Sequence, residues 1–292
     1  MTRAAALGVL LALGASPAPR AEDALQIATT ARSVQPGEIV VFTATAAGPI
    51  EVLRARALER DLPAYRLDTG AWQVLLGLDL DTPARSYPVS FEARISGLDV
   101  STTSTLVVTT KRFTTRSLRV NDAFVNPPPA TLERITADAA ELADVFANPH
   151  PARLWTEPFV RPVPGRATSS FGTRSIFNGQ PRQPHGGTDF PSPTGTPIAA
   201  PAGGRIVIAR DLYFTGNTIV IDHGLGVFSL LAHLSAMAVH AGDLVMAGQD
   251  LGRVGATGRV TGPHLHWAVR VDGARVDPLS LLAVLGPPPP TP

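Results

Sequence analysis

Three consecutive prolines, Pro127-Pro128-Pro129, prevent any strand or helix from running continuously through the middle of the chain. A proline lacks a backbone donor and holds its φ angle fixed, so a run of three ends a sheet ladder and keeps the chain extended. On both sides of this run, short β-branched and apolar segments alternate with turns that contain glycine or proline. The sequence therefore predicts a mainly β fold with two β domains joined by a proline-rich segment.

The part before the prolines, residues 22–125, is predicted to form an antiparallel, β-sandwich-like domain. The strand candidates, chosen for β-branched content and partial alternation, span residues 38–45, 73–80, 87–95 and 104–110. Short strands at this spacing are typical of immunoglobulin-like sandwiches. The region has no histidine and no cluster of carboxylates, so we expect a structural or binding module without chemistry of its own.

The proline-rich segment, residues 126–164, is predicted to contain one amphipathic helix over residues 131–148. Thr131 is a plausible N-cap, and Glu133 is favourably placed in the first turn. Apolar residues recur at intervals of three and four, which places them on one face of a helix. These residues are Leu132, Ile135, Ala139, Leu142, Val145 and Phe146.

Residues 165–284 are predicted to form a second β domain, which carries the chemistry. Its strand candidates span residues 205–210, 217–222, 227–232, 250–254 and 265–271, and no long helical pattern interrupts them. The tail, residues 285–292, is nearly all proline at its end and is expected to be disordered.

The first 21 residues are typical of a secretory signal peptide. Arg3 precedes an apolar run over residues 4–13, which is too short to remain in a bilayer as a spanning helix. Cleavage after Ala18 and after Ala21 are both compatible with the small residues there. We expect export to the periplasm or cell envelope, without stable membrane insertion; the alternative is an apolar N-terminus on a cytosolic protein.

Charge and cysteine content limit the partners and the metal ligands. The formal net charge is +1, which provides no broad basic field, so nucleic acid is not an expected partner. The chain has no cysteine. Disulfides, thiolate metal ligands and a cysteine-linked lipid anchor are therefore excluded, and any zinc must be held by His, Asp or Glu.

Two stretches of the second domain offer such ligands. His264 and His266 are two apart at the start of a predicted strand, so both side chains face one side. The alternative for this pair is a solvated strand face. His185 and Asp189 lie on a glycine-containing loop that leads into an extended segment, where the backbone can approach an ion closely.

The other histidines are harder to interpret from spacing. His233 follows an apolar strand, where a satisfied core histidine is more common than a catalytic one. His223 is interpreted as a structural turn residue after a strand. His150 and His240 lie among proline or loop residues and are assigned no role.

Taken in order, the motifs of the second domain resemble those of the M23 (lysostaphin/LytM-type) metallopeptidases, over about residues 162–282. They are Phe171-Gly172-Thr173-Arg174, the loop from His185 to Asp189, the run from Gly216 to Gly224, Ala232-His233-Leu234-Ser235, and Gly255-Ala256-Thr257-Gly258 leading to Gly262-Pro263-His264-Leu265-His266. The N-terminal region is similar to that of exported bacterial members. The resemblance implies a groove on an antiparallel β-sheet with one zinc ion at its floor.

The resemblance also implies roles for individual residues. It places the zinc ligands at His185, Asp189 and His266, and the catalytic histidines at His233 and His264. Two imidazoles and a carboxylate leave one tetrahedral position open, as in catalytic zinc sites. The two histidines then serve as general base and as stabiliser of the oxyanion, in either assignment. Family members often carry tyrosine at the position of Leu231, so a hydroxyl is lost or relocated here.

The expected function is that of a zinc endopeptidase that cuts peptide cross-links or stems of bacterial peptidoglycan, with a D-alanyl-diaminopimelate bond favoured. The alternative is a non-catalytic LytM-type regulator that binds and activates other wall hydrolases; the complete ligand set favours the enzyme. An envelope protein could act as a regulatory partner. We also hypothesise that the N-terminal domain or the helix covers the groove. The oligomeric state is left open.

Overall fold

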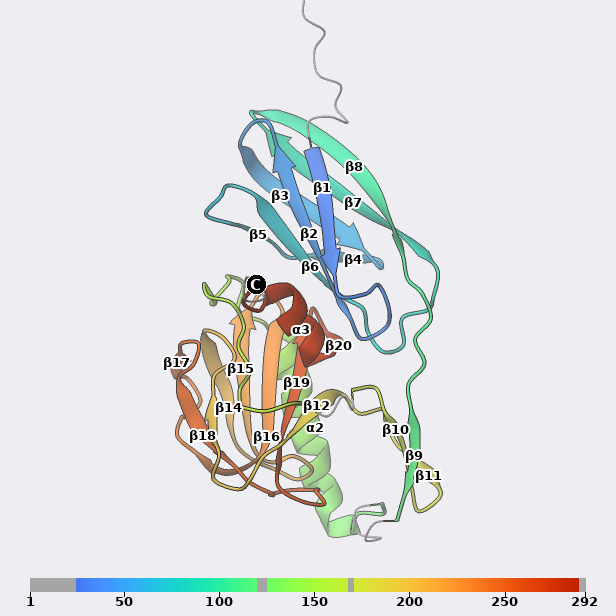
Figure 1. Ribbon diagram of the computed structural model, residues 1–292, viewed down its shortest axis with the longest axis vertical. Helices are drawn as coiled ribbons and strands as arrows, with labels where there is room; N and C mark the ends of the chain where they lie inside the picture. Colours follow the sequence, from blue (N-terminus) through green and yellow to red (C-terminus); the bar gives the residue numbers. More distant parts are fainter. Residues whose placement is uncertain (1–24, 120–124, 168–170, 289–292) are drawn as a thin grey trace, which may run out of the picture.

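The computed structural model describes residues 25–119, 125–167 and 171–288 (Figure 1). The expected signal peptide and the last residues of the proline-rich tail lie outside these ranges. The described chain is mainly β, and its sheets are antiparallel apart from one pair of strands, which confirms the expected fold class. No helix in the described part combines the length and the apolar character needed to cross a membrane.

The N-terminal part is a sandwich of two four-stranded sheets, with strand orders β1-β2-β6-β5 and β4-β3-β7-β8. Alternate residues along β7 are buried, as expected where one face of a sheet meets a core. Between the sheets, the rings of Phe42 and Phe91 meet edge to face with centroids 5.4 Å apart. The strands are β1 (Leu25–Ala31), β2 (Ile39–Ala46), β3 (Ile50–Ala57), β4 (Arg60–Leu62), β5 (Ala64–Arg66), β6 (Trp72–Gly77), β7 (Ser86–Ile95) and β8 (Leu98–Val107).

The C-terminal part is built on a nine-stranded sheet whose main order is β12-β19-β16-β15-β14-β17. Strand β19 lies between β12 and β16, so it is paired along both edges. The strands are β12 (Gly187–Pro191), β13 (Pro197–Ala199), β14 (Gly204–Leu212), β15 (Gly216–Gly224), β16 (Val227–Met237), β17 (Leu244–Val245), β18 (Asp250–Val254), β19 (His264–Val271) and β20 (Ala274–Val276).

The predicted helix is present as α2 (Leu132–Ala147), preceded by a 3-10 turn, η2 (Pro129–Thr131). Thr131 occupies the N-cap position, as predicted, but its hydroxyl donates to the Pro128 carbonyl and makes no cap bond to the helix. The expected apolar face is also only partly used. Leu132 is 50% exposed, whereas Leu142, Val145 and Phe146 pack on the large sheet.

A second, unexpected helix, α3 (Pro278–Leu285), closes the chain. The Asp277 side chain caps it by accepting a hydrogen bond from the Leu279 amide at 3.0 Å, and Pro278 occupies the first helical position. This short helix follows the last strand and does not interrupt the sheet, so the expected β domain stands, with a helical end that the sequence analysis did not predict. In Figure 1 this helix lies between the sandwich and the large sheet.

One hydrophobic core cluster contains residues of both parts, and the sandwich has a second cluster of its own. Ile39, Val41 and Leu75, from the outer face of the sheet β1-β2-β6-β5, belong to the same buried cluster as Val271 and Leu281 of the C-terminal part. Strand β2 is buried on both faces as a result. The sandwich is therefore packed firmly against the large sheet.

One connection between the parts differs from the expected antiparallel pattern. Strand β9 (Thr115–Leu118) pairs in parallel with β10 (Arg174–Phe177), which pairs in turn with β11 (Gln180–Pro181). Parallel neighbours need a long crossover, here the segment that contains α2. As Figure 1 shows, β9 runs down from the sandwich to lie beside β10. The segment that leads to His185 is thus held by a strand from the N-terminal side.

Candidate functional site

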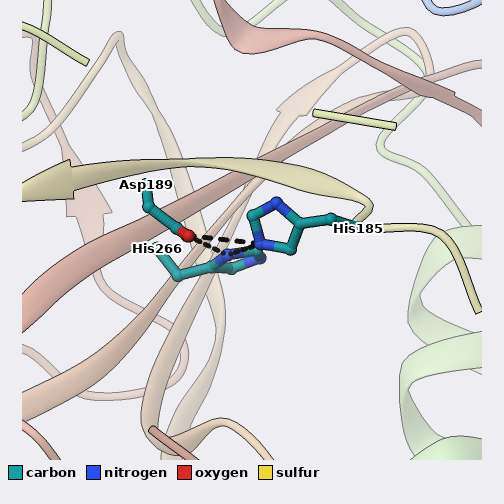
Figure 2. Close-up of side chains that lie close together, drawn as sticks. All are labelled: His185, Asp189 and His266. Atoms are coloured by element: carbon teal, nitrogen blue, oxygen red, sulfur yellow. Dashed lines mark hydrogen bonds and ion pairs between the residues drawn. The ribbon is translucent and has the colours of Figure 1, made fainter. Parts of the chain in front are cut away.

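The pairing of β12 with β19 brings the two ligand-bearing stretches together. In the antiparallel register Asp189 lies opposite His266, and Pro191 lies opposite His264. Directly opposed side chains project from the same face of a sheet. His185 is two residues before β12, and Figure 2 shows its ring turned toward the other two side chains.

Three donor atoms converge within this group. His266 Nδ1 lies 3.0 Å from Asp189 Oδ1 and 3.0 Å from His185 Nε2, and the third edge, from His185 Nε2 to Asp189 Oδ1, is 3.2 Å (Figure 2). Donor atoms around a tetrahedral zinc ion stand about 3.3 Å apart, given zinc–ligand distances of about 2 Å. Among the described residues this is the group of His, Asp and Glu side chains that could hold a metal ion. The donor set and its spacing both fit zinc.

The surroundings of the group favour an ionised Asp189 and a neutral His266. Burial alone would raise the pKa of Asp189, but hydrogen bonds from His185 and His266 hold that pKa far below its usual range. Burial lowers the pKa of His266, against the opposing effect of its hydrogen bond with Asp189. A carboxylate that stays ionised and an imidazole that stays neutral are the forms that bind zinc.

His233 reaches the same site from β16 through an irregular backbone. Its neighbour Ala232 lies opposite His266, so regular alternation would point His233 to the other face of the sheet. The register of β16 against β15 shifts in this region, and His233 has a φ of 69°, in the left-handed range. Its ring centroid consequently lies 4.9 Å from that of His264 and 5.9 Å from that of His266. Such bulges commonly re-aim a side chain next to an active site.

Backbone carbonyls fix the tautomers of both non-ligand histidines. His233 Nδ1 lies 2.9 Å from the Thr257 carbonyl oxygen, and His264 Nδ1 lies 2.9 Å from that of Gly262. A carbonyl oxygen only accepts, so each Nδ1 carries the proton and each neutral ring has its lone pair on Nε2. His264 Nε2 points into the site, 3.7 Å from Asp189 Oδ1. Burial also lowers the pKa of His233 to about 3, so this ring is neutral near pH 7.

The remaining described histidines lie outside the group. His223 is completely buried at the end of β15, where Nδ1 donates to the Gly203 carbonyl and Nε2 accepts from Ser229. This role is structural, as the sequence suggested, although the residue is in a strand rather than a turn. His150 Nδ1 contacts the Ala152 carbonyl at 3.0 Å, and His240 is a surface side chain, 92% exposed.

Leu231 is fully buried in the main core and lies opposite Trp267, whose side chain is on the other face from His266. A hydroxyl at this position would point away from the site. Leu231 is therefore a core residue in this protein.

Two supporting residues were not assigned roles from the sequence. Thr257, in the Gly-Ala-Thr-Gly stretch, holds His233 through its carbonyl and joins Asn217 and Leu234 through its hydroxyl. Gly187 allows the His266 ring to lie against the backbone of β12, since a Cβ there would lie 2.6 Å from His266 Cε1. In the sequence, the only hint to either residue is its place in a glycine-containing motif.

Comparison with known proteins adds the following findings. Residues 183–278 match the family model described as Peptidase family M23. A crystal structure from Pseudomonas aeruginosa, named for peptidase M23, has 32% identity and a TM-score of 0.67, over 86% of this chain and 96% of that one.

Curated relatives match somewhat more than a third of the chain. The Peptidoglycan DD-endopeptidase ShyA of Vibrio cholerae is 42% identical over 113 residues, 38% of this chain and 26% of the relative. The DD-carboxypeptidase/endopeptidase Mpg of Neisseria meningitidis is 41% identical over 116 residues, 40% of this chain and 27% of the relative. The matched region thus spans about a quarter of the length of each relative.

Proposed function

Because the chain belongs to peptidase family M23, we propose that it is a zinc-dependent endopeptidase that hydrolyses peptide bonds of bacterial peptidoglycan. One observation carries the proposal: three metal donors and two further histidines with fixed tautomers converge on one face of the sheet. The names of the curated relatives support the substrate class.

In the proposed mechanism His185, Asp189 and His266 hold the zinc ion. When bound, zinc supplies Lewis acidity toward a peptide carbonyl and toward water. His233 and His264 handle protons at Nε2. The carbonyls of Thr257 and Gly262 hold the proton of each neutral ring on Nδ1, so Nε2 can accept a proton. Nε2 can donate a proton only after it has accepted one. This order suits removal of a proton from water and its return to the leaving amine.

The zinc site is tested by substitution of one ligand. We expect His266→Ala to lose bound zinc and cleavage together, because two remaining donors hold the ion poorly. His240→Ala is the matched control, since that histidine is on the surface away from the site. Zinc content is measured by atomic absorption after gel filtration. Full zinc occupancy in His266→Ala would contradict the ligand assignment.

For the bond cleaved, we propose a cross-link of the D-alanyl-diaminopimelate type, supported by the DD-endopeptidase names of the relatives. Purified sacculi are digested with and without a chelator, and the muropeptides are separated by mass. Loss of cross-linked dimers, with recovery of monomers, is expected only without chelator. Unchanged dimers, together with increased cleavage by a separate wall hydrolase, would favour the non-catalytic regulator instead.

We also propose that the protein acts after export to the periplasm or cell envelope. The proposal is supported by the apolar run that follows Arg3. Fusion of residues 1–30 to an alkaline phosphatase that folds only outside the cytoplasm tests it. Phosphatase activity in cells is expected, and its absence would contradict export.

A further inference from the structure

A cavity of about 370 Å³ lies between helix α2 and the sheet face that carries the metal group. Its lining reaches His266 at one end and Arg270 at the other, with Ala268 between them. Alternation along β19 puts these three side chains on one face of the strand. The cavity is therefore continuous with the proposed active site.

The middle of the cavity is apolar. Phe228 and Leu230 of β16 lie opposite Arg270 and Ala268 in the register and line the cavity. Helix α2 covers them with Phe146, whose ring meets that of Phe228 edge to face at 5.2 Å. A volume of this size falls within the range of small-ligand sites.

Arg270 makes no ion pair with a carboxylate in the described part of the chain, although Asp79, the partner of Arg275, is near enough to act on its charge. Its guanidinium lies over the Phe146 ring, 4.6 Å from the centroid, and donates to the Gly273 carbonyl at 3.0 Å. The neighbouring Arg275, by contrast, is paired with Asp79 and Asp81. Burial and the charge of Arg275 lower the pKa of Arg270, against a smaller opposing effect of the Asp79 charge. A partly buried cation that makes no direct ion pair is stabilised further when a ligand carboxylate binds to it.

We propose that Arg270 binds a carboxylate of the peptide substrate, while Ala268 and Leu230 contact an aliphatic part of it. The inference rests on the proposed peptidase function and adds a determinant of specificity. Arg270 is four residues beyond His266, about 13 Å along the strand. The carboxylate therefore lies roughly three or four residues from the bond that is cut. It belongs either to the C-terminus of the peptide or to a side chain.

The experiment compares synthetic cross-linked peptide dimers that differ only in their carboxyl groups. One dimer has all carboxyl groups free, a second is amidated at the C-terminus only, and a third is amidated at the side-chain carboxyl only. The wild type is expected to cleave the free-acid dimer with roughly 10- to 100-fold higher kcat/KM than one of the amidated dimers, as for loss of one charge-assisted hydrogen-bond pair. The amidated dimer that is cleaved more slowly than the free-acid dimer shows which carboxylate Arg270 binds.

Arg270→Gln is expected to remove that preference, mainly through KM, and to cleave the amidated dimer as well as the wild type does. Arg270→Lys keeps the charge and should retain part of the preference. Arg205→Gln, an exposed arginine on β14 remote from the cavity, is the matched control. Equal loss on free and amidated dimers in Arg270→Gln would indicate a structural role and overturn the proposal.

The two proposals fail in distinguishable ways. If the wild type cleaves free and amidated dimers equally, the carboxylate site is wrong and the peptidase function stands. If the wild type cleaves none of the dimers and leaves sacculi intact, the proposed function itself is wrong.

Discussion

The carbonyl oxygen of Thr257 lies 2.9 Å from Nδ1 of His233 and holds the ring of a histidine whose backbone has a left-handed φ of 69°. Thr257 is itself fixed, because its hydroxyl donates to the Leu234 carbonyl and accepts from the Asn217 amide. The contacts of Thr257 thus fix both the ring of His233 and its unusual backbone conformation. A substitution at His233 therefore affects the ring chemistry and the backbone at once.

We expect His233→Asn to retain zinc and to lower kcat/KM by at least about 100-fold, the usual contribution of a positioned acid–base group. Asparagine tolerates a positive φ, whereas His233→Ala should lose the same activity and also about 1 kcal/mol of stability. Zinc content, dimer cleavage and urea unfolding are measured on both variants. Equal zinc loss in the His233 and His266 variants would refute the division between catalytic residue and ligand.

Gly187→Ala should weaken zinc binding by about 10-fold or more, because the added methyl group would meet the His266 ring at 2.6–2.7 Å. Gly186→Ala is the matched control: a Cβ there meets nothing within 4 Å. Competition with a chromogenic chelator gives the zinc affinity of each variant. Similar affinities in the two variants would show that the close packing of Gly187 on His266 has no part in metal binding.

The buried His223 predicts a pH-dependent stability. Burial lowers its pKa from 6.5 to about 4, so the unfolded chain takes up a proton at His223 at a higher pH than the folded chain does. The stability it contributes is complete above pH 6.5 and is lost as the pH falls toward 4. Between pH 7 and pH 5 the loss is about 2 kcal/mol.

His223→Asn isolates this effect, because the amide can still donate to the Gly203 carbonyl but does not titrate. The difference in unfolding free energy between wild type and variant should shrink by about 2 kcal/mol from pH 7 to pH 5. Urea unfolding at each pH measures it. A difference that stays constant would mean that His223 does not resist protonation in the folded protein.

Arg32 joins the two parts of the chain by ion pairs to Glu38 and Asp277, whose side chains are only 2% and 5% exposed. Arg32→Ala leaves Asp277 without its cation and should cost about 3 kcal/mol of stability. Arg56→Ala removes an exposed pair with Asp61 and should cost less than about 1 kcal/mol. Urea unfolding compares them; equal costs would contradict a stabilising role for the Arg32 cluster.

Much of the fold follows from local patterns in the sequence. Strands such as β19 have clear alternation or long apolar runs, and α2 has the expected period, so both were predicted within a few residues. The placement of His264 and His266 on one face of β19 follows from the same alternation. These features depend on neighbours in sequence, which a pattern can report.

Features that depend on distant partners were missed. Strand β2 contains the run Ile39-Val40-Val41-Phe42, whose continuous apolar character indicates cover on both faces, and the second cover comes from the C-terminal part. The orientation of His233 depends on a bulge that residue spacing does not reveal, so its place in the site was expected only from the family resemblance of Ala232-His233-Leu234-Ser235. The parallel pairing of β9 and β10 likewise arises from segments far apart in the chain.

The core shared by Ile39, Val41 and Leu75 with the C-terminal part constrains how such a protein can be rearranged in evolution. Deleting residues up to Pro164 would expose this apolar surface and remove the strand that pairs with β10, so reduced activity of the remainder would not by itself report on inhibition. A recombination event that moves the metal-bearing sheet into another protein must also supply an apolar surface that buries the exposed residues. The stability of the metal-bearing sheet therefore depends on an apolar partner surface, whichever domain supplies it.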